Sequence, residues 1–137
     1  MSVTLSYPKP RATEAKLFQI ARTDTTATQF ATLPKYAVIV GEYVIGAVAS
    51  DATTSASISV GTTATSNELI ATFDVKTAAT GEGYSPAGAA AVGSAMATVL
   101  TVDTPVYGKY TSSGAETTGG PWTVKIEYFV TGPGETL

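Results

Sequence analysis

The longest apolar run of the chain, residues 36–48, predicts its central strand. Most of its side chains are β-branched or aromatic, the types that suit a pleated, half-buried surface. Apolar residues occupy both parities of the run, so we expect the core to cover one face and a second layer or a neighbouring subunit to cover the other. Gly41 and Gly46 interrupt the run, and either permits a β-bulge that exchanges the two faces.

Alternation of apolar and polar residues predicts most of the other strands. Ser55–Gly61 places Ala56, Ile58 and Val60 on one side and three serines on the other, which is typical of a half-solvated strand. Trp122–Val130 alternates in the same way, and its Trp122 face is expected in the core, with the strand at the centre of a sheet. Further strands are predicted over residues 14–22 (with an amphipathic helical turn as the alternative), 69–75, 94–102 and 106–111.

The segments between these strands are rich in Gly, Pro, Asp and Thr. Residues 23–32 read as a Thr-rich connection with Phe30 at the edge of the core, and residues 76–91 as a long loop. Strands at roughly ten-residue spacing predict an all-β, single-domain β-sandwich of about seven or eight strands. A jelly roll is the first topology. An immunoglobulin-like sandwich is second, because the chain lacks a Cys-Trp-Cys pattern and Trp122 stands on the last strand.

A chain of 137 residues is long enough for one hydrophobic core. Pro8 and Pro10 favour extended backbone, so residues 1–13 are predicted to be an N-terminal arm, residues 14–131 the sandwich domain and residues 132–137 a polar tail. No apolar run approaches the ~18 residues of a membrane span, and no secretory signal is visible. We therefore expect synthesis in a host cytoplasm and no membrane partner.

The composition argues against catalysis. The chain has no histidine and no cysteine, which excludes Ser-His-Asp and Cys-His arrangements and thiolate metal sites. Asp74 and Asp103 lie near the ends of predicted strands and could form a carboxylate pair, but acidic residues at strand ends are usually solvated. With Asp51 they could hold calcium, but no acid-rich loop with spaced ligands supports such a site. We expect no enzymatic activity, no metal and no cofactor.

Charge is distributed unevenly along the chain. Residues 1–35 carry a balance of +3, and residues 36–137 carry −6. One interpretation is an N-terminal arm that docks on an acidic partner surface; the other is an ordinary solvated face. An aromatic stacking platform is a further interpretation of the sequence, but few basic residues accompany the aromatics that would form it. We therefore expect those aromatics in the core or in an interface and predict no nucleic-acid partner. The members of the platform would be Tyr107, Tyr110, Tyr128 and Phe129.

Three stretches carry a resemblance to a known family: LPKYAVIVGEYVIGAVASDATTSASISVGT from Leu33, the following ELIATFDV, and the closing GGPWTVKIEYFV. They resemble a family of small tailed-bacteriophage virion proteins. The resemblance implies a structural protein of the phage head, first a decoration or cement protein on the outer capsid surface, and next a head-fibre or tail component. It implies the major capsid protein as partner and a homo-oligomer, trimer or dimer, and it carries over no catalytic residue.

The candidate contact residues come from the arm and the central strand. The arm contributes cations, and one face of residues 36–48 is expected in an oligomer interface. The candidates are Lys9, Arg11, Lys16, Arg22, Tyr43 and Ile45. The alternative function from a different class is a carbohydrate-binding β-sandwich module that uses aromatic residues in its loops.

Overall fold

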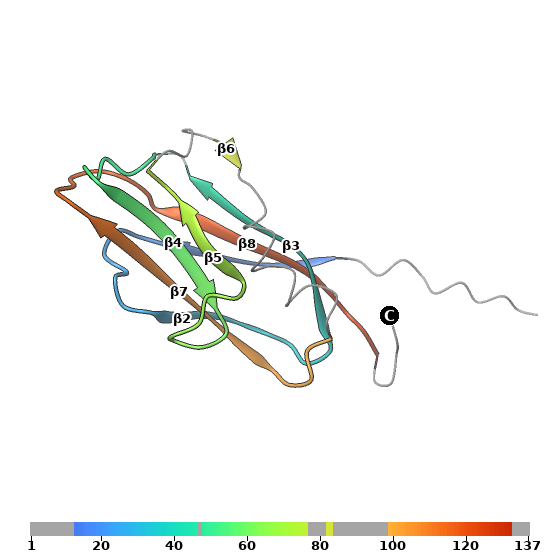
Figure 1. The fold of residues 1–137 in the computed structure, drawn as a ribbon. Helices are drawn as coiled ribbons and strands as arrows, with labels where there is room; N and C mark the ends of the chain where they lie inside the picture. Colours follow the sequence, from blue (N-terminus) through green and yellow to red (C-terminus); the bar gives the residue numbers. More distant parts are fainter. Residues whose placement is uncertain (1–12, 47, 77–81, 84–98, 133–137) are drawn as a thin grey trace, which may run out of the picture.

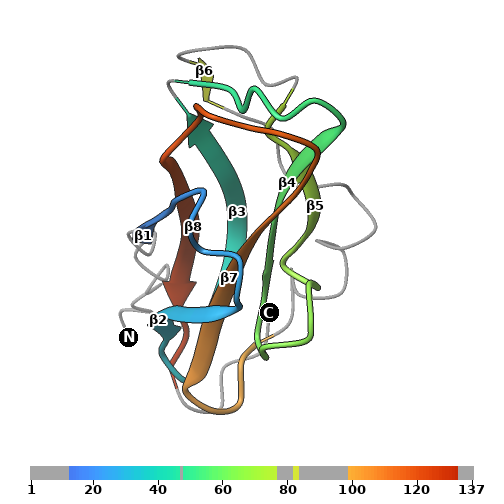
Figure 2. The same cartoon turned by 90° about the vertical axis from the view of Figure 1, so that its left-hand side faces the viewer.

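The computed structural model of this protein describes residues 13–46, 48–76, 82–83 and 99–132. These residues form strands and turns and no helix, so the described part contains no helix able to span a membrane. The strands make two four-stranded antiparallel sheets, which face each other as two layers (Figures 1 and 2). Sheet A has the order β1-β8-β3-β6, and sheet B has the order β2-β7-β4-β5. The bounds are β1 Glu14–Ile20, β2 Thr28–Leu33, β3 Ala37–Gly46, β4 Ser55–Gly61, β5 Ile70–Asp74, β6 Glu82–Gly83, β7 Thr104–Ser113 and β8 Trp122–Val130.

The strand order is that of a jelly roll. The first strand pairs with the last, the second with the seventh, the third with the sixth and the fourth with the fifth. A chain that pairs in this way is one long hairpin rolled so that successive strand pairs alternate between two sheets. The β-sandwich and its jelly-roll topology are therefore confirmed, and the immunoglobulin-like alternative is wrong.

The core lies between the inner faces of the two sheets. On β8, Trp122, Val124, Ile126 and Tyr128 are buried, and the strand lies between β1 and β3, as the alternation predicted. On sheet B, inward positions of β4 and β7 meet them from the other side. Those positions are Ala56, Ile58, Val60, Val106 and Tyr110.

A β-bulge in β3 reverses the direction of its side chains. Ile39 pairs with Tyr128 and Gly41 with Glu127, so β3 has one more residue than its partner at Val40. Before the bulge, odd-numbered Ala37 and Ile39 face the core. After it the inward positions are even-numbered, which buries Val44 and points Tyr43 outward. The predicted exchange of faces beside Gly41 is confirmed.

Two segments differ from their predictions. Residues 23–32 are not all connection, because β2 begins at Thr28; the extra residue Phe30 forms a bulge there and stacks on Phe18, and this hides the alternation. In the predicted strand 94–102, residues 94–98 lie outside the described residues and 99–102 are not strand. Leu100 instead exchanges backbone hydrogen bonds with Tyr36 and Ala37, which ties it to the β2–β3 turn.

The remaining boundaries are close to prediction. β7 begins two residues early, at Thr104, because Pro105 pairs in register with Thr32 of β2. Within the predicted loop 76–91, Glu82–Gly83 pairs with the end of β3, and most of the rest lies outside the described residues. The predicted arm and tail lie almost wholly outside them too.

Hydrogen bonds join two long connections at one end of the sandwich. Asp51, between β3 and β4, accepts the amides of Thr117 and Thr118 at 2.8 and 2.9 Å and the Thr117 hydroxyl at 2.6 Å. These bonds hold the pKa of Asp51 well below its ordinary value. Nearby, the Tyr110 hydroxyl donates to Glu116 at 2.5 Å and lies 2.9 Å from the Ser50 hydroxyl. The connections are thereby fixed to the core strand β7.

Candidate functional site

An apolar area covers part of the outer face of sheet A. The strand registers place Leu17, Lys125 and Tyr43 in one row across β1, β8 and β3, with Ile45 in the next row. Leu17 is 61% exposed, and Ile45 and the bulge residue Val40 are each 38% exposed. We call Leu17, Val40, Tyr43 and Ile45 the sheet A patch. Several large apolar side chains on one sheet face are typical of a contact surface rather than of scattered exposure.

A charge pair lies at the centre of this face. Lys125 Nζ is 2.8 Å from Glu127 Oε1 and 5.8 Å from the centre of the Tyr43 ring. The hydrogen bond and charge of Glu127 raise the pKa of Lys125. The sheet A patch therefore surrounds a neutralised pair, which costs less to cover than a single charge would.

The structure separates the candidate contact residues into two groups. Tyr43 and Ile45 lie together on the outer face of β3. Lys16 has the inward parity of Phe18 and Ile20 on β1. Arg22 lies beyond the end of β1, where its charge adds to the hydrogen bond from Tyr110 in lowering the pKa of Glu116. Lys9 and Arg11 lie outside the described residues.

Two members of the sheet A patch were missed in the sequence. Leu17 has the opposite parity to the buried Phe18 and Ile20, and this alternation alone marks it as outward-facing. Val40 carries no such signal, because its exposure depends on the bulge.

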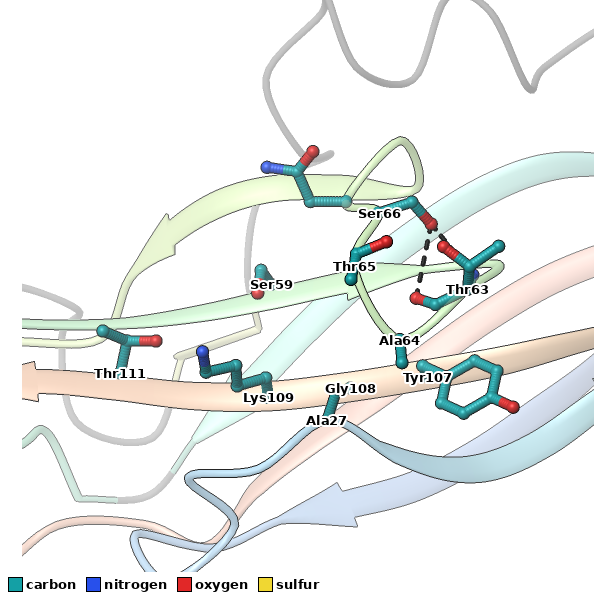
Figure 3. A pocket seen from close by; sticks show the side chains of 11 residues that line it. Ala27, Ser59, Thr63, Ala64, Thr65, Ser66, Tyr107, Gly108, Lys109 and Thr111 are labelled. Carbon is teal, nitrogen blue, oxygen red and sulfur yellow. Dashed lines mark hydrogen bonds between the residues drawn. The ribbon is translucent and has the colours of Figure 1, made fainter.

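A groove lies on the outer face of sheet B, beneath the β4–β5 connection (Figure 3). It has a volume of about 370 Å³. Outward residues of β4 and β7 form its floor, residues of the β4–β5 connection form one wall, and Ala27 borders it from before β2. We call it the sheet B groove. Its lining is Ala27, Ser59, Thr63, Ala64, Thr65, Ser66, Asn67, Tyr107, Gly108, Lys109 and Thr111.

The wall of the sheet B groove is held by its own hydrogen bonds. Glu68 accepts the Thr62 amide at 2.8 Å and also the Thr62 hydroxyl. Burial raises the pKa of Glu68, but hydrogen bonds from Ser66 and Thr62 outweigh it and bring the pKa below its ordinary value. The Thr63 amide donates to Ser66 Oγ at 2.9 Å. The groove is therefore a preformed feature of the fold.

The three aspartates that were candidates for catalysis or calcium binding accept hydrogen bonds from the protein itself. Asp103 accepts the Lys35 amide at 2.9 Å, and Asp74 accepts the Lys76 amide at 2.8 Å. Asp51 joins two connections, as described above. Among the described residues, no group of three or more His, Cys, Asp or Glu is placed to hold a metal ion.

Glu42 is a buried carboxyl at a position that the sequence pattern did not mark as part of a site. It follows the bulge on β3, points into the sandwich beside Ile126 and is 0% exposed. Neither carboxyl oxygen has a hydrogen-bond partner among the described residues. Burial therefore raises its pKa from 4.5 to about 8. The only sign of this site in the sequence is that Glu42 is a charged residue within the apolar run of residues 36–48.

No family model matches this sequence, and no curated protein matches it. Two solved structures share its fold. A chain in the acidic stable capsid structure of Helicobacter pylori bacteriophage KHP30 is similar with a TM-score of 0.60 and 14% identity, over 88% of this chain and 90% of its own. A chain in the cyanophage Pam1 capsid asymmetric unit is similar with a TM-score of 0.58 and 16% identity, over 96% of this chain and 94% of its own.

Proposed function

We propose that this protein is a non-enzymatic structural protein of a bacteriophage virion. More specifically, we propose a decoration or cement protein that binds the outer surface of the head and stabilises it. The observation that carries the proposal is the shared jelly roll, which extends over nearly the whole of this chain and of chains from two phage capsid structures. The absence of histidine and cysteine and the structural roles of the three aspartates agree with a role in binding.

The sheet A patch is the proposed contact surface. It offers apolar area around an internally neutralised charge pair, so a partner can cover it without leaving an unpaired charge. The partners are further copies of this chain, as a dimer or trimer, and the major capsid protein. Many copies of a modest interface add through multivalency, so the shell gains stability without any single strong contact.

Attachment to capsids tests this proposal. Purified protein mixed with undecorated phage capsids is expected to co-sediment with them and to raise the temperature at which the shells open. Bovine serum albumin at equal concentration is the control. Capsids that neither bind the protein nor gain thermal stability would contradict the proposal.

Replacing Ile45 by aspartate is expected to convert an oligomer into monomer. The wild-type protein should sediment as a multiple of 14.0 kDa, and the variant as a single 14.0 kDa chain or as insoluble protein. The reason is that a carboxylate enclosed in an apolar interface costs several kcal/mol. Ser55→Asp, which adds the same charge at an exposed position of sheet B, is the control and should leave the oligomer intact. If the wild-type protein is a monomer at micromolar concentration, the sheet A patch does not mediate self-association.

Removing residues 1–13 is expected to weaken capsid attachment while leaving the fold intact. The proposal is that the basic arm, with Lys9 and Arg11, lies on an acidic capsid surface. If so, attachment of the wild type should decline as salt approaches 1 M, where the screening length falls to about 3 Å. A Lys9→Gln, Arg11→Gln double variant keeps the length of the arm and should behave like the truncation. If all three proteins occupy the capsids equally at low and high salt, the arm does not contribute to attachment.

A further inference from the structure

We propose that the sheet B groove binds an acidic saccharide, with the Lys109 ammonium holding its acid group and the neighbouring hydroxyls holding the sugar. The groove lies on the sheet opposite the sheet A patch. A protein attached through sheet A would therefore keep the groove open to solvent. The inference does not rest on capsid attachment, since it depends on the groove alone.

The charge of the groove indicates an anionic ligand. Lys109 projects from the floor and has no ion-pair partner among the described residues. None of the described lining residues carries a carboxylate, although the protein as a whole has a net charge of −3. A single cation in a concave site can bind one acid group of a ligand. One positive charge is not enough to bind a nucleic-acid strand, because such a strand requires several cations along its phosphate backbone.

The uncharged lining groups indicate that this ligand carries hydroxyls. Ser59, Thr65 and Thr111 point into the groove, and none of them has a hydrogen-bond partner among the described residues (Figure 3). Each hydroxyl donates one hydrogen bond and accepts two, which matches the edge of a sugar ring. An apolar ligand would leave these groups unpaired, so the groove disfavours it.

Tyr107 supplies the surface that a sugar ring requires. Its half-buried ring stands at one end of the groove, and Lys109 follows two residues later on the same face of β7 (Figure 3). The weakly acidic C–H bonds on one face of a pyranose suit the electron-rich face of an aromatic ring. The groove therefore offers a cation, hydroxyls and an aromatic ring, and this combination favours binding of an acidic saccharide over inorganic sulfate or phosphate.

The groove is of suitable size and is already formed. Its volume of about 370 Å³ lies within the range of small-molecule sites. The bonds from Thr62 to Glu68 and from Thr63 to Ser66 hold its wall in place, so little ordering is required on binding.

The test is an amide chemical-shift titration of the full chain with three probes: 3′-sialyllactose, lactose and sodium sulfate. We expect 3′-sialyllactose to perturb the amides of Ser59, Thr65 and Lys109 with a Kd of about 1 mM. Lactose and sulfate should bind at least about tenfold more weakly. Lys109→Gln should weaken 3′-sialyllactose binding about tenfold or more, because it removes a charge-assisted hydrogen bond.

Lys35→Gln is the matched control. It removes the same charge from an exposed position on the β2–β3 turn, outside the groove, and should leave binding unchanged. Thr111→Val, which keeps the shape and removes one hydroxyl, should weaken binding severalfold. The amide spectra of Lys35→Gln, Thr111→Val and Lys109→Gln must match the wild-type spectrum outside the groove, which shows that each variant is folded.

Four outcomes would overturn the inference. These are no groove perturbation by 3′-sialyllactose at about 10 mM, equal binding of lactose, equal binding of sulfate, or equal loss in Lys35→Gln. If Lys109→Gln instead loses attachment to capsids while no saccharide binds, the groove is a protein contact. That result would overturn the saccharide inference and leave the virion proposal standing.

Discussion

The free energy of unfolding of this protein is expected to fall by roughly 4 kcal/mol between pH 5 and pH 8, and Glu42→Leu is expected to abolish that fall. Glu42 is fully buried on the inner face of β3, with no hydrogen-bond partner among the described residues. Burial raises its pKa to about 8 in the folded protein, against 4.5 in the unfolded chain. The folded state therefore keeps a proton that the unfolded state loses.

The direction of the effect follows from proton binding. Below pH 4.5 both states carry the proton, and the contribution of Glu42 is fully present. Between pH 4.5 and 8 only the folded state carries it, so each unit of rising pH lowers stability by about 1.4 kcal/mol. Above pH 8 the carboxylate is ionised in both states, and the loss is complete. Because of Glu42, we expect the protein to be more stable in mildly acidic solution than at pH 8.

Two tyrosines near the core titrate outside this window. Tyr128 on β8 and Tyr110 on β7 both face inward. Burial raises the pKa of both tyrosines above its ordinary value of 10, beyond the window. The pKa of Asp51 lies below the window, so its contribution is lost only at more acid pH.

Urea unfolding at several pH values measures this profile. Glu42→Gln should flatten it while keeping the volume of the side chain, and Glu42→Leu should flatten it and add stability at pH 8, because it also removes an unpaired polar group. Glu127→Gln, which removes a carboxylate that is partly exposed and paired with Lys125, is the control and should change stability by less than about 1 kcal/mol. A wild-type profile that is level from pH 5 to 8 would show that Glu42 has a partner in solution.

Trp122→Ala is expected to lower the free energy of unfolding by about 3–5 kcal/mol at neutral pH. Trp122 is 1% exposed, lies against Gly46 of β3 and stacks on Tyr110 with ring centres 5.2 Å apart. It therefore joins the two sheets, and truncation removes its buried area and leaves a cavity. Thermal and urea unfolding measure the loss.

Phe129→Ala provides the comparison on the same strand. Phe129 has the outward parity of β8 and is half-buried, so its truncation should cost clearly less than that of Trp122. Equal losses for the two variants would mean that the two faces of β8 are equally buried in solution, as they would be if a partner covered sheet A.

Much of the fold follows from the sequence alone. The alternation in Ser55–Gly61 and Trp122–Val130 predicts both the strands and their buried sides, because neighbouring side chains on a strand point to opposite faces whatever the rest of the chain does. Turn residues between such strands indicate a sandwich. The sequence also places Tyr43 and Ile45 on one face of the central strand, and the strand register puts both on its outer side; their role in a contact stays a prediction.

Tertiary structure decided the features that depend on pairing between distant segments. The extra residue at Val40 turns Glu42 into the core, whereas an unbroken strand would have placed it outside with Val38 and Val44. The sequence grouped Tyr107 and Tyr110 as one set of aromatics, yet the first lies in the sheet B groove and the second in the core. The groove itself combines β4, β7 and the connection after β4. No local pattern encodes it, because its residues meet only when the rolled hairpin closes.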